Sequence, residues 1–126
     1  MNVKATFRPH ERLKDPRDFR RAFERRRSES DDVLVVYGVE NRREHPRLGI
    51  SVSRKKVRSA HARNRLKRLV REAFRLSKAE LPSGIDLVII PRRENVTLAA
   101  VRRSLVALAG SIVRRLNPAS GVKAPP

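Results

Sequence analysis

The sequence predicts an α+β domain in which three helices pack on a small, mostly antiparallel sheet of about four strands. Helical apolar patterns occur near the start, in the middle and near the end of the chain, and short β-branched runs lie between them. A length of 126 residues suffices for one domain with a modest core. We assign residues 1–118 to this domain, with a basic arm at 1–12, and we expect residues 119–126 to be a disordered tail.

The charge of the chain indicates a polyanionic partner. It has 31 Lys and Arg against 13 Asp and Glu, a net charge of +18, and RNA or DNA is the usual partner of such proteins. The absence of Cys excludes disulfides and thiolate metal sites. There is no long apolar run at the N-terminus or elsewhere, so we expect no signal peptide, no membrane span and a cytoplasmic location.

The first helix is predicted to begin at Pro16 and to end near Arg26. Asp15 can cap it, and proline suits the first helical position. Phe19 and Phe23 lie one turn apart on the same face. Their pattern alone favours burial in the core, and the alternative is that their edges line a groove in which bases stack.

Two apolar runs predict strands that are covered on both faces. Residues 33–40 are rich in β-branched side chains and follow a polar turn at 27–32. Residues 85–90 form a short apolar run, interrupted only by Asp86, which is typical of a central strand. The polar segment 41–46 is interpreted as a hairpin connection to the next strand.

Residues 47–53 alternate strictly and predict a strand with one polar face. Its apolar side chains point inward, whereas Gly49, Ser51 and Ser53 point outward. A flat face of this kind could let an extended chain pass close to the backbone.

A strongly basic segment, residues 54–75, dominates the middle of the chain. It contains ten Lys or Arg among 22 residues and one acid, Glu72, and from about Ala60 its apolar residues recur at helical spacing. Such a dense set of like charges is expected to face a polyanion. A solvated face or a membrane-surface helix would be the alternatives, but the single acid and the small apolar side chains favour nucleic acid.

The last helix is predicted to follow Thr97, which can cap it, and to end before Asn117 and Pro118. No catalytic cluster is evident elsewhere: the three His residues are scattered, the carboxylates lie mostly beside basic residues, and there is no Gly-rich phosphate loop. The residues alone therefore predict a nucleic-acid-binding protein without its own active site.

Residues 47–53 and 55–75, with Arg63-Asn64-Arg65 at the centre of the second segment, resemble the signature of the bacterial ribonuclease P protein component. Matching residues upstream and downstream extend the resemblance over 11–116. It implies a single RNA-binding domain of that family. It also implies that the basic helix forms a left-handed βαβ crossover, although such crossovers are almost always right-handed.

The resemblance further implies a function: the protein subunit of a ribonucleoprotein endonuclease that removes the 5′ leader of precursor tRNA. The RNA subunit would carry the catalysis, with Mg²⁺ bound by that RNA and the substrate, and none bound tightly by the protein. The protein would be monomeric in the holoenzyme. Non-catalytic RNA-binding proteins of the ribosomal type, and DNA-binding proteins, remain alternatives; the latter lack the expected dimer or groove-reading features here.

Two sets of site residues follow from the resemblance. The residues expected to bind the RNA subunit are Arg54, Lys55, Lys56, Arg58, His61, Arg63, Asn64, Arg65, Lys67, Arg68, Arg71 and Arg75. The residues expected to bind the precursor-tRNA leader are Phe19, Phe23, Tyr37, Ser51 and Ser53. For Phe19 and Phe23, the resemblance therefore implies leader binding, whereas their pattern alone favours burial in the core.

Overall fold

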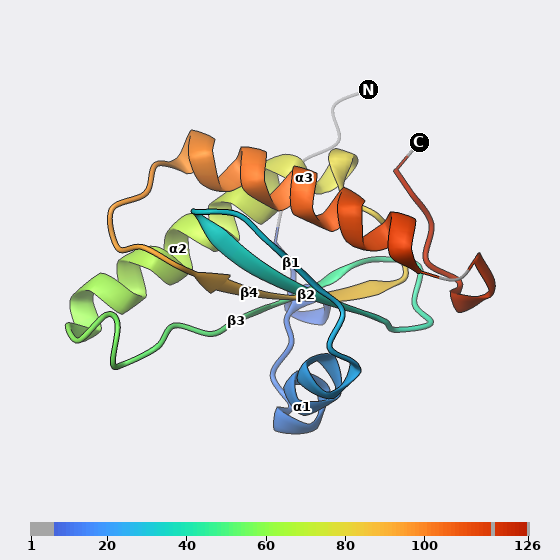
Figure 1. The fold of residues 1–126 in the computed structure, drawn as a ribbon, viewed down its shortest axis with the longest axis horizontal. Helices are drawn as coiled ribbons and strands as arrows, with labels where there is room; N and C mark the ends of the chain where they lie inside the picture. The colour runs from blue at the N-terminus through green and yellow to red at the C-terminus, as the bar shows by residue number, and fades with distance from the viewer. Residues whose placement is uncertain (1–6, 117, 126) are drawn as a thin grey trace.

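The computed structural model describes residues 7–116 and 118–125, which form three layers (Figure 1). A four-stranded sheet lies between α1 on one face and the pair α2 and α3 on the other (Figure 1). The elements are α1 (Pro16–Arg25), β1 (Ser28–Ser30), β2 (Leu34–Glu40), β3 (Arg47–Ile50), α2 (Ala60–Ser77), β4 (Ile85–Pro91) and α3 (Leu98–Arg115). The predicted α+β class, with three helices and four strands, is confirmed.

The strand order is β1-β2-β4-β3. β4 pairs antiparallel with β2 and parallel with β3, so α2 is the crossover between two parallel neighbours. The hairpin predicted at 41–46 is wrong, because β4 lies between β2 and β3. β4 takes the centre because both of its faces are covered and, apart from Asp86, its side chains are apolar. The left hand of the crossover stays a prediction.

The predicted turn at 27–32 contains a strand instead. Ser28, Glu29 and Ser30 form β1, which pairs antiparallel with Tyr37, Val36 and Val35 of β2. Edge strands can be short and polar because their pairing uses backbone groups. The strand predicted at 47–53 is shorter than expected and ends at residue 50.

Side-chain caps begin all three helices. Asp15 Oδ1 accepts a hydrogen bond from Arg17 N at 2.9 Å, and Thr97 Oγ1 accepts one from Ala100 N at 3.1 Å, which confirms both predicted caps. Ser59, whose role the sequence reasoning missed, caps α2 through Ala62 N at 3.3 Å. The chain leaves α1 through a left-handed residue at 26.

The core lies mainly between the sheet and the α2–α3 pair. Phe74 of α2, Leu105 and Ile112 of α3, and Leu87 of β4 are fully buried there. A smaller cluster lies under α1 and leaves several aromatic rings partly exposed. The sheet face under α1 is therefore the less completely covered one.

Described segments near both ends of the chain contact the body of the protein. Residues 1–6 of the predicted arm lie outside the described residues; residues 9–11 form a 3-10 helix, and Leu13 N donates to Leu48 O at 2.8 Å. The tail, expected to be disordered, returns so that Ser83 and Lys123 exchange two backbone hydrogen bonds, at 2.9 and 3.1 Å. The backbone N–H and C=O of Ser83 thus find hydrogen-bond partners in the tail. The domain boundary at 118 stays a prediction.

Candidate nucleic-acid interface

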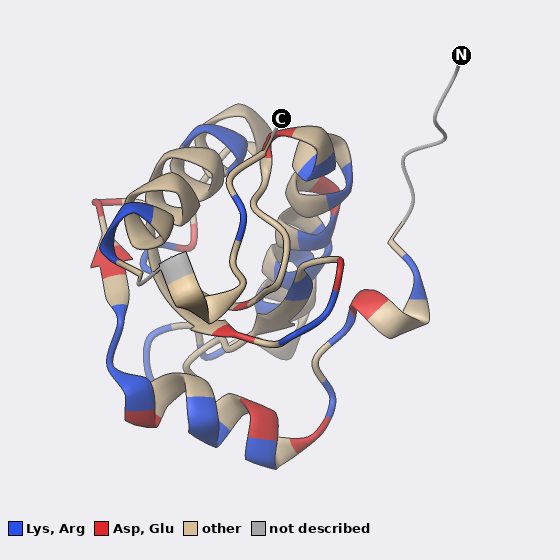
Figure 2. Cartoon of the chain, turned by 90° about the vertical axis from the view of Figure 1, so that its right-hand side faces the viewer, with Lys and Arg blue, Asp and Glu red and all other residues tan. Residues whose placement is uncertain are grey.

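α2 separates its apolar and cationic side chains on opposite faces. Ala62, Leu66, Val70 and Ala73 are buried against the core. Eight of the twelve residues predicted to bind the RNA subunit are exposed, namely Arg54, Lys55, Lys56, Arg58, His61, Asn64, Arg65 and Arg68. The other four, Arg63, Lys67, Arg71 and Arg75, are half-buried. Lys and Arg recur along α2 and along α1 (Figure 2).

Arg63 organises the loop that precedes α2. Its Nη1 donates to Val57 O at 2.9 Å and to Arg58 O at 2.7 Å. These two bonds hold the end of the basic loop against the first turn of the helix. Residue types along the chain carry no signal for this contact, because its acceptors are backbone carbonyls.

Arg65, like Arg63, donates to a backbone carbonyl of a neighbouring loop. Its Nη2 donates to Glu94 O at 2.7 Å and so ties α2 to the loop that follows β4. A guanidinium has five N–H donors, so both Arg63 and Arg65 keep donors for a phosphate while their positions are fixed. Asn64 lies exposed between them.

Arg75 differs from the other predicted RNA-binding arginines because it pairs with Glu72. Its Nε donates to Glu72 Oε2 at 3.0 Å, and a second nitrogen bonds the other carboxylate oxygen. These bonds raise the pKa of Arg75 and lower that of Glu72. Its charge is therefore partly neutralised within the protein.

Three aromatic rings come together between α1 and the sheet. Phe19, Phe23 and Tyr37 are all half-buried and pack on a small cluster that includes Val39 and Val88. The rings of Phe23 and Tyr37 meet edge to face, with centroids 5.0 Å apart. Each ring thus supports the core with one side and remains partly accessible on the other.

The alternation of residues 47–53 predicted that Gly49 lies on an open polar face, and this prediction is wrong. Gly49 is buried, and a Cβ built there would lie 2.8 Å from Cε1 and Cζ of Phe19. The lack of a side chain at Gly49 therefore lets the Phe19 ring lie directly on the backbone of β3. Gly49, Val88 and Tyr37 are aligned across three strands beneath α1.

The two predicted serines have different surroundings. Ser51 is half-exposed just beyond β3, and its N–H donates to Ile89 O at 3.0 Å. Ser53 Oγ accepts from Lys55 N and Lys56 N, at 3.2 and 3.3 Å, and so closes the turn at the start of the basic loop. Ser53 therefore belongs to the loop before α2, whereas Phe19 and Phe23 belong to α1, Tyr37 belongs to β2 and Ser51 directly follows β3.

A buried ion pair lies at one end of the sheet, and the sequence patterns did not predict it. Arg47 forms a bidentate contact with Asp86, Nε to Oδ1 at 2.8 Å and Nη2 to Oδ2 at 2.7 Å, and Asn41 Nδ2 donates to the same carboxylate at 2.9 Å. The bonds to Asp86 raise the pKa of Arg47. Asp18 of α1 approaches Arg47 at 3.6 Å, which links α1 to this network. Asp86 is the single acid within the apolar run 85–90, and this was the sequence signal that could have indicated the ion pair.

No metal site or membrane-crossing helix is found in the described parts of the chain. Among residues 7–116 and 118–125, no three His, Asp or Glu side chains are grouped so that they could hold a metal ion. Within the same residues, none of the helices is long and apolar enough to cross a membrane.

Known proteins resemble this chain over most of its length. The family model described as Ribonuclease P matches residues 7–113. The chain belongs to the ribonuclease P protein family. A relative from Photorhabdus laumondii, named ribonuclease P protein component, is 37% identical over 113 residues, which cover 90% of this chain and 92% of the relative. One of the same name from Methylococcus capsulatus is 46% identical over 96 residues, or 75% and 74% of the two chains.

Solved structures of this family share the fold. The RNase P protein from Thermotoga maritima is 38% identical, with a TM-score of 0.70, and the match covers 85% of this chain and 98% of that one. The Staphylococcus aureus RNase P protein is 33% identical, with a TM-score of 0.69 and the same two coverages. The arrangement of three helices on a four-stranded sheet is thus that of the family.

Proposed function

We propose that this chain is the protein subunit of a ribonuclease P and assists removal of the 5′ leader from precursor tRNA. In this proposal the RNA subunit is the catalyst, and Mg²⁺ is bound by that RNA and by the substrate. The protein acts as a cytoplasmic monomer within the holoenzyme. Membership of the family and the net charge of +18 support this role.

The RNA subunit is proposed to bind the cationic face of α2 and the loop before it. The observation that carries this proposal is that α2 has one buried apolar face and one cationic face. The cationic face and the loop before α2 together expose eight of the residues predicted to bind the RNA subunit. A polyanion would relieve the repulsion among these charges and release its own counterions. The fixed positions of Arg63 and Arg65 would reduce the ordering cost of binding.

The leader is proposed to bind between α1 and the sheet. Phe19, Phe23 and Tyr37 offer partly exposed rings there, and single-stranded bases stack on such rings. By holding the RNA subunit and the leader at once, the protein would increase the affinity of the holoenzyme for precursor over mature tRNA. This aromatic group favours leader recognition over the purely structural, ribosomal type of RNA binding.

The decisive experiment measures leader removal by a bacterial ribonuclease P RNA at low Mg²⁺, with and without this protein. We expect the protein to stimulate cleavage strongly and to cleave nothing when highly purified and free of RNA. A structural RNA-binding protein would give no stimulation. Robust leader removal by the RNA-free protein would contradict the assignment of catalysis to RNA.

A further inference from the structure

The tail, of which the structure describes residues 118–125, lies beside the start of β4 and the connection between β2 and β3 (Figure 1). Val122 is half-buried and packs on the main core, and its N–H donates to Ser120 Oγ at 3.3 Å. Ser83 and Lys123 exchange their two backbone hydrogen bonds at the same place. These tail residues lie beyond 7–113, which match the family model, so the family's fold does not by itself account for this contact.

Gly84 lets the backbone of the tail approach closely. Its φ of +76° lies in the left-handed region, which glycine adopts without strain. A Cβ built at Gly84 would lie 2.7 Å from Gly121 O and 3.4 Å from Arg43 O. The tail and the connection 41–46 therefore both rest on the backbone of Gly84.

Asn41 joins this meeting point to the buried ion pair. Its backbone N–H donates to Gly84 O at 3.0 Å. Its Nδ2 donates to Asp86 Oδ1 at 2.9 Å and to His45 O at 3.2 Å, and its Oδ1 accepts from Arg43 N at 2.8 Å. One side chain thus bonds to the connection 41–46 and to β4 at once.

Two sets of contacts continue from there to α1. Arg47 binds Asp86 through two hydrogen bonds and lies 3.6 Å from Asp18 of α1. Asp86 is only 1% exposed, so water cannot easily replace a protein partner that its carboxylate loses. The His45 ring meets the His10 ring, in the segment before α1, edge to face with centroids 4.8 Å apart. A change at Gly84 can therefore reach α1 through direct contacts.

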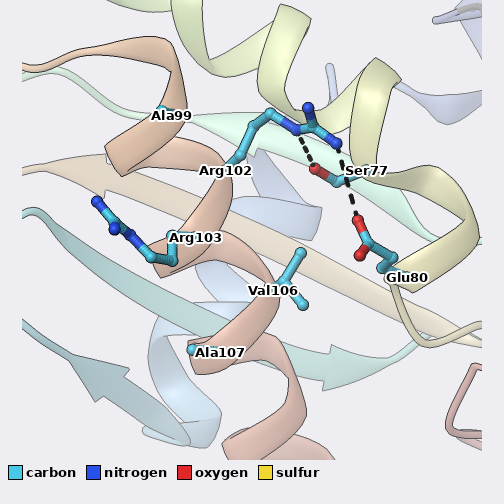
Figure 3. Close-up of a pocket in the computed structure, with 7 residues that line it drawn as sticks. All are labelled: Ser77, Glu80, Ala99, Arg102, Arg103, Val106 and Ala107. Atoms are coloured by element: carbon cyan, nitrogen blue, oxygen red, sulfur yellow. Dashed lines mark hydrogen bonds and ion pairs between the residues drawn. The ribbon is translucent and has the colours of Figure 1, made fainter.

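A contact of a different kind provides a comparison. In a hollow of about 570 Å³ between α3 and the end of α2, Arg102 Nε donates to Ser77 Oγ at 3.2 Å (Figure 3). Arg102 Nη2 lies 3.8 Å from Glu80 in the same hollow (Figure 3). This contact also joins distant segments, but it lies on the sheet face opposite α1 (Figure 1). A substitution of Arg102 should loosen the protein without acting on α1.

We propose that the tail is a clasp that fixes the position of α1 on the sheet. The docked tail holds Gly84 and Asn41, Asn41 helps to hold Asp86 on Arg47, and Arg47 holds Asp18. The docked and undocked tail are the two states of this device, and both ends of the contact path respond to which state is populated. Its consequence for RNA rests on the proposed function: α1 carries two of the rings proposed to bind the leader, so a docked tail would favour leader-bearing tRNA.

The first test needs no RNA and compares two substitutions of one residue. Lys123→Pro removes the N–H that bonds Ser83 O, whereas Lys123→Ala removes the same charge and keeps that N–H. We use the full chain labelled with ¹⁵N, in sulfate buffer to favour the folded state. Lys123→Pro should shift the amide resonances of Asn41 and Asp18 and should speed hydrogen exchange at Asn41 by about twofold to tenfold. Lys123→Ala should leave both close to the parent protein.

Two further variants keep this test decisive. A chain truncated after Leu116 removes the whole tail and should reproduce the Lys123→Pro shifts, and an unchanged Asp18 resonance in it would overturn the clasp. Arg102→Ala should lower the melting temperature without shifting the Asp18 resonance. If Arg102→Ala shifts it as Lys123→Pro does, or if both Lys123 variants shift it alike, α1 responds to overall stability or charge and the proposal is wrong.

The second test uses the assembled holoenzyme and separates leader recognition from assembly. Relative to Lys123→Ala, Lys123→Pro should lower the ratio of affinities for leader-bearing over leaderless tRNA by about twofold to tenfold. Affinity for the RNA subunit should change by less than about twofold. Equal losses for the two tRNAs, or weaker assembly, would overturn the link between the tail and leader binding.

Failure of the clasp is distinct from failure of the proposed function. If the protein stimulates leader removal but the Asp18 resonance ignores the tail, only the clasp is wrong. If the protein gives no stimulation, the proposed function is wrong, and the amide shifts still decide whether the tail positions α1.

Discussion

At the scale of single residues, Gly49 leaves the space in which the Phe19 ring of α1 packs on β3. We predict that Gly49→Ala displaces the Phe19 ring, because the new Cβ would lie 2.8 Å from it. Such overpacking costs about 1–3 kcal/mol of stability. It should also change acrylamide quenching of Tyr37, the only tyrosine in a chain without tryptophan. It should lower the preference of the holoenzyme for leader-bearing tRNA.

Gly38→Ala is the matched control for this substitution. It makes the same change in the same sheet, with an equally close contact of 2.8 Å, but toward Ile112 on the opposite face. It should lose stability without changing the leader preference. If both variants alter the leader preference alike, the contact between Gly49 and Phe19 does not position the leader surface.

Arg68 tests the cationic face of α2, where it is exposed. Arg68→Ala should weaken assembly with the RNA subunit by about 1–3 kcal/mol, as expected for a charge-assisted hydrogen bond. The slope of log affinity against log salt should become shallower by about 1, because fewer counterions are released. A salt titration of binding measures both effects.

Arg114 of α3 provides the control for Arg68. It is also exposed, and its Nη2 donates to Ser111 Oγ at 2.9 Å. Arg114→Ala removes the same charge outside α2, so it should change assembly and its salt slope much less. Equal effects would mean that the RNA responds to net charge rather than to the face of α2.

At the scale of elements, the start of α1 should be sensitive to acid. Hydrogen bonds from the side chain and backbone of Arg17 lower the pKa of Asp15 to about 2. Because this pKa is lower in the folded protein than in the unfolded chain, the stabilisation is complete above the unfolded value near 4. It is lost as the pH falls toward 2.

Thermal melts between pH 5 and pH 2 measure this dependence. Asp15→Asn should keep the cap but remove this contribution to the pH dependence, since Asn caps helices as well as Asp does. Asp15→Ala should lower the melting temperature at every pH. A pH profile for Asp15→Asn that matches the parent protein would exclude Asp15 as the titrating group.

At the scale of the whole molecule, the net charge of +18 opposes compaction. We predict that the isolated protein is loosely folded in dilute buffer without multivalent anions. Sulfate should stabilise it by occupying cationic sites that exist only in the folded state. Circular dichroism melts in sulfate and in NaCl of equal ionic strength separate specific occupation from screening. Melts that do not respond to sulfate would contradict the prediction.

The sequence by itself determined the features that depend on near neighbours. Caps such as Asp15 and Thr97 and the helical spacing of apolar residues act over a few positions, so local patterns suffice to locate the helices, β2 and β4. The charge pattern of residues 54–75 indicated the class of partner for the same reason, because the residues that carry it are contiguous. Residues 47–53 and 55–75 carried the resemblance to the family.

Only the tertiary structure decided what depends on distant segments. The pair of Arg47 and Asp86 spans 39 positions, and the bond from Arg65 to Glu94 spans 29. The hairpin expected at 41–46 failed because strand order is a competition among all strands for the buried centre, and β4, apart from Asp86, is apolar on both faces. Likewise, strand alternation alone places Gly49 on the polar face of β3. It becomes a packing position only because α1 brings Phe19 onto it, and periodicity within one strand carries no information about which other segment will cover it.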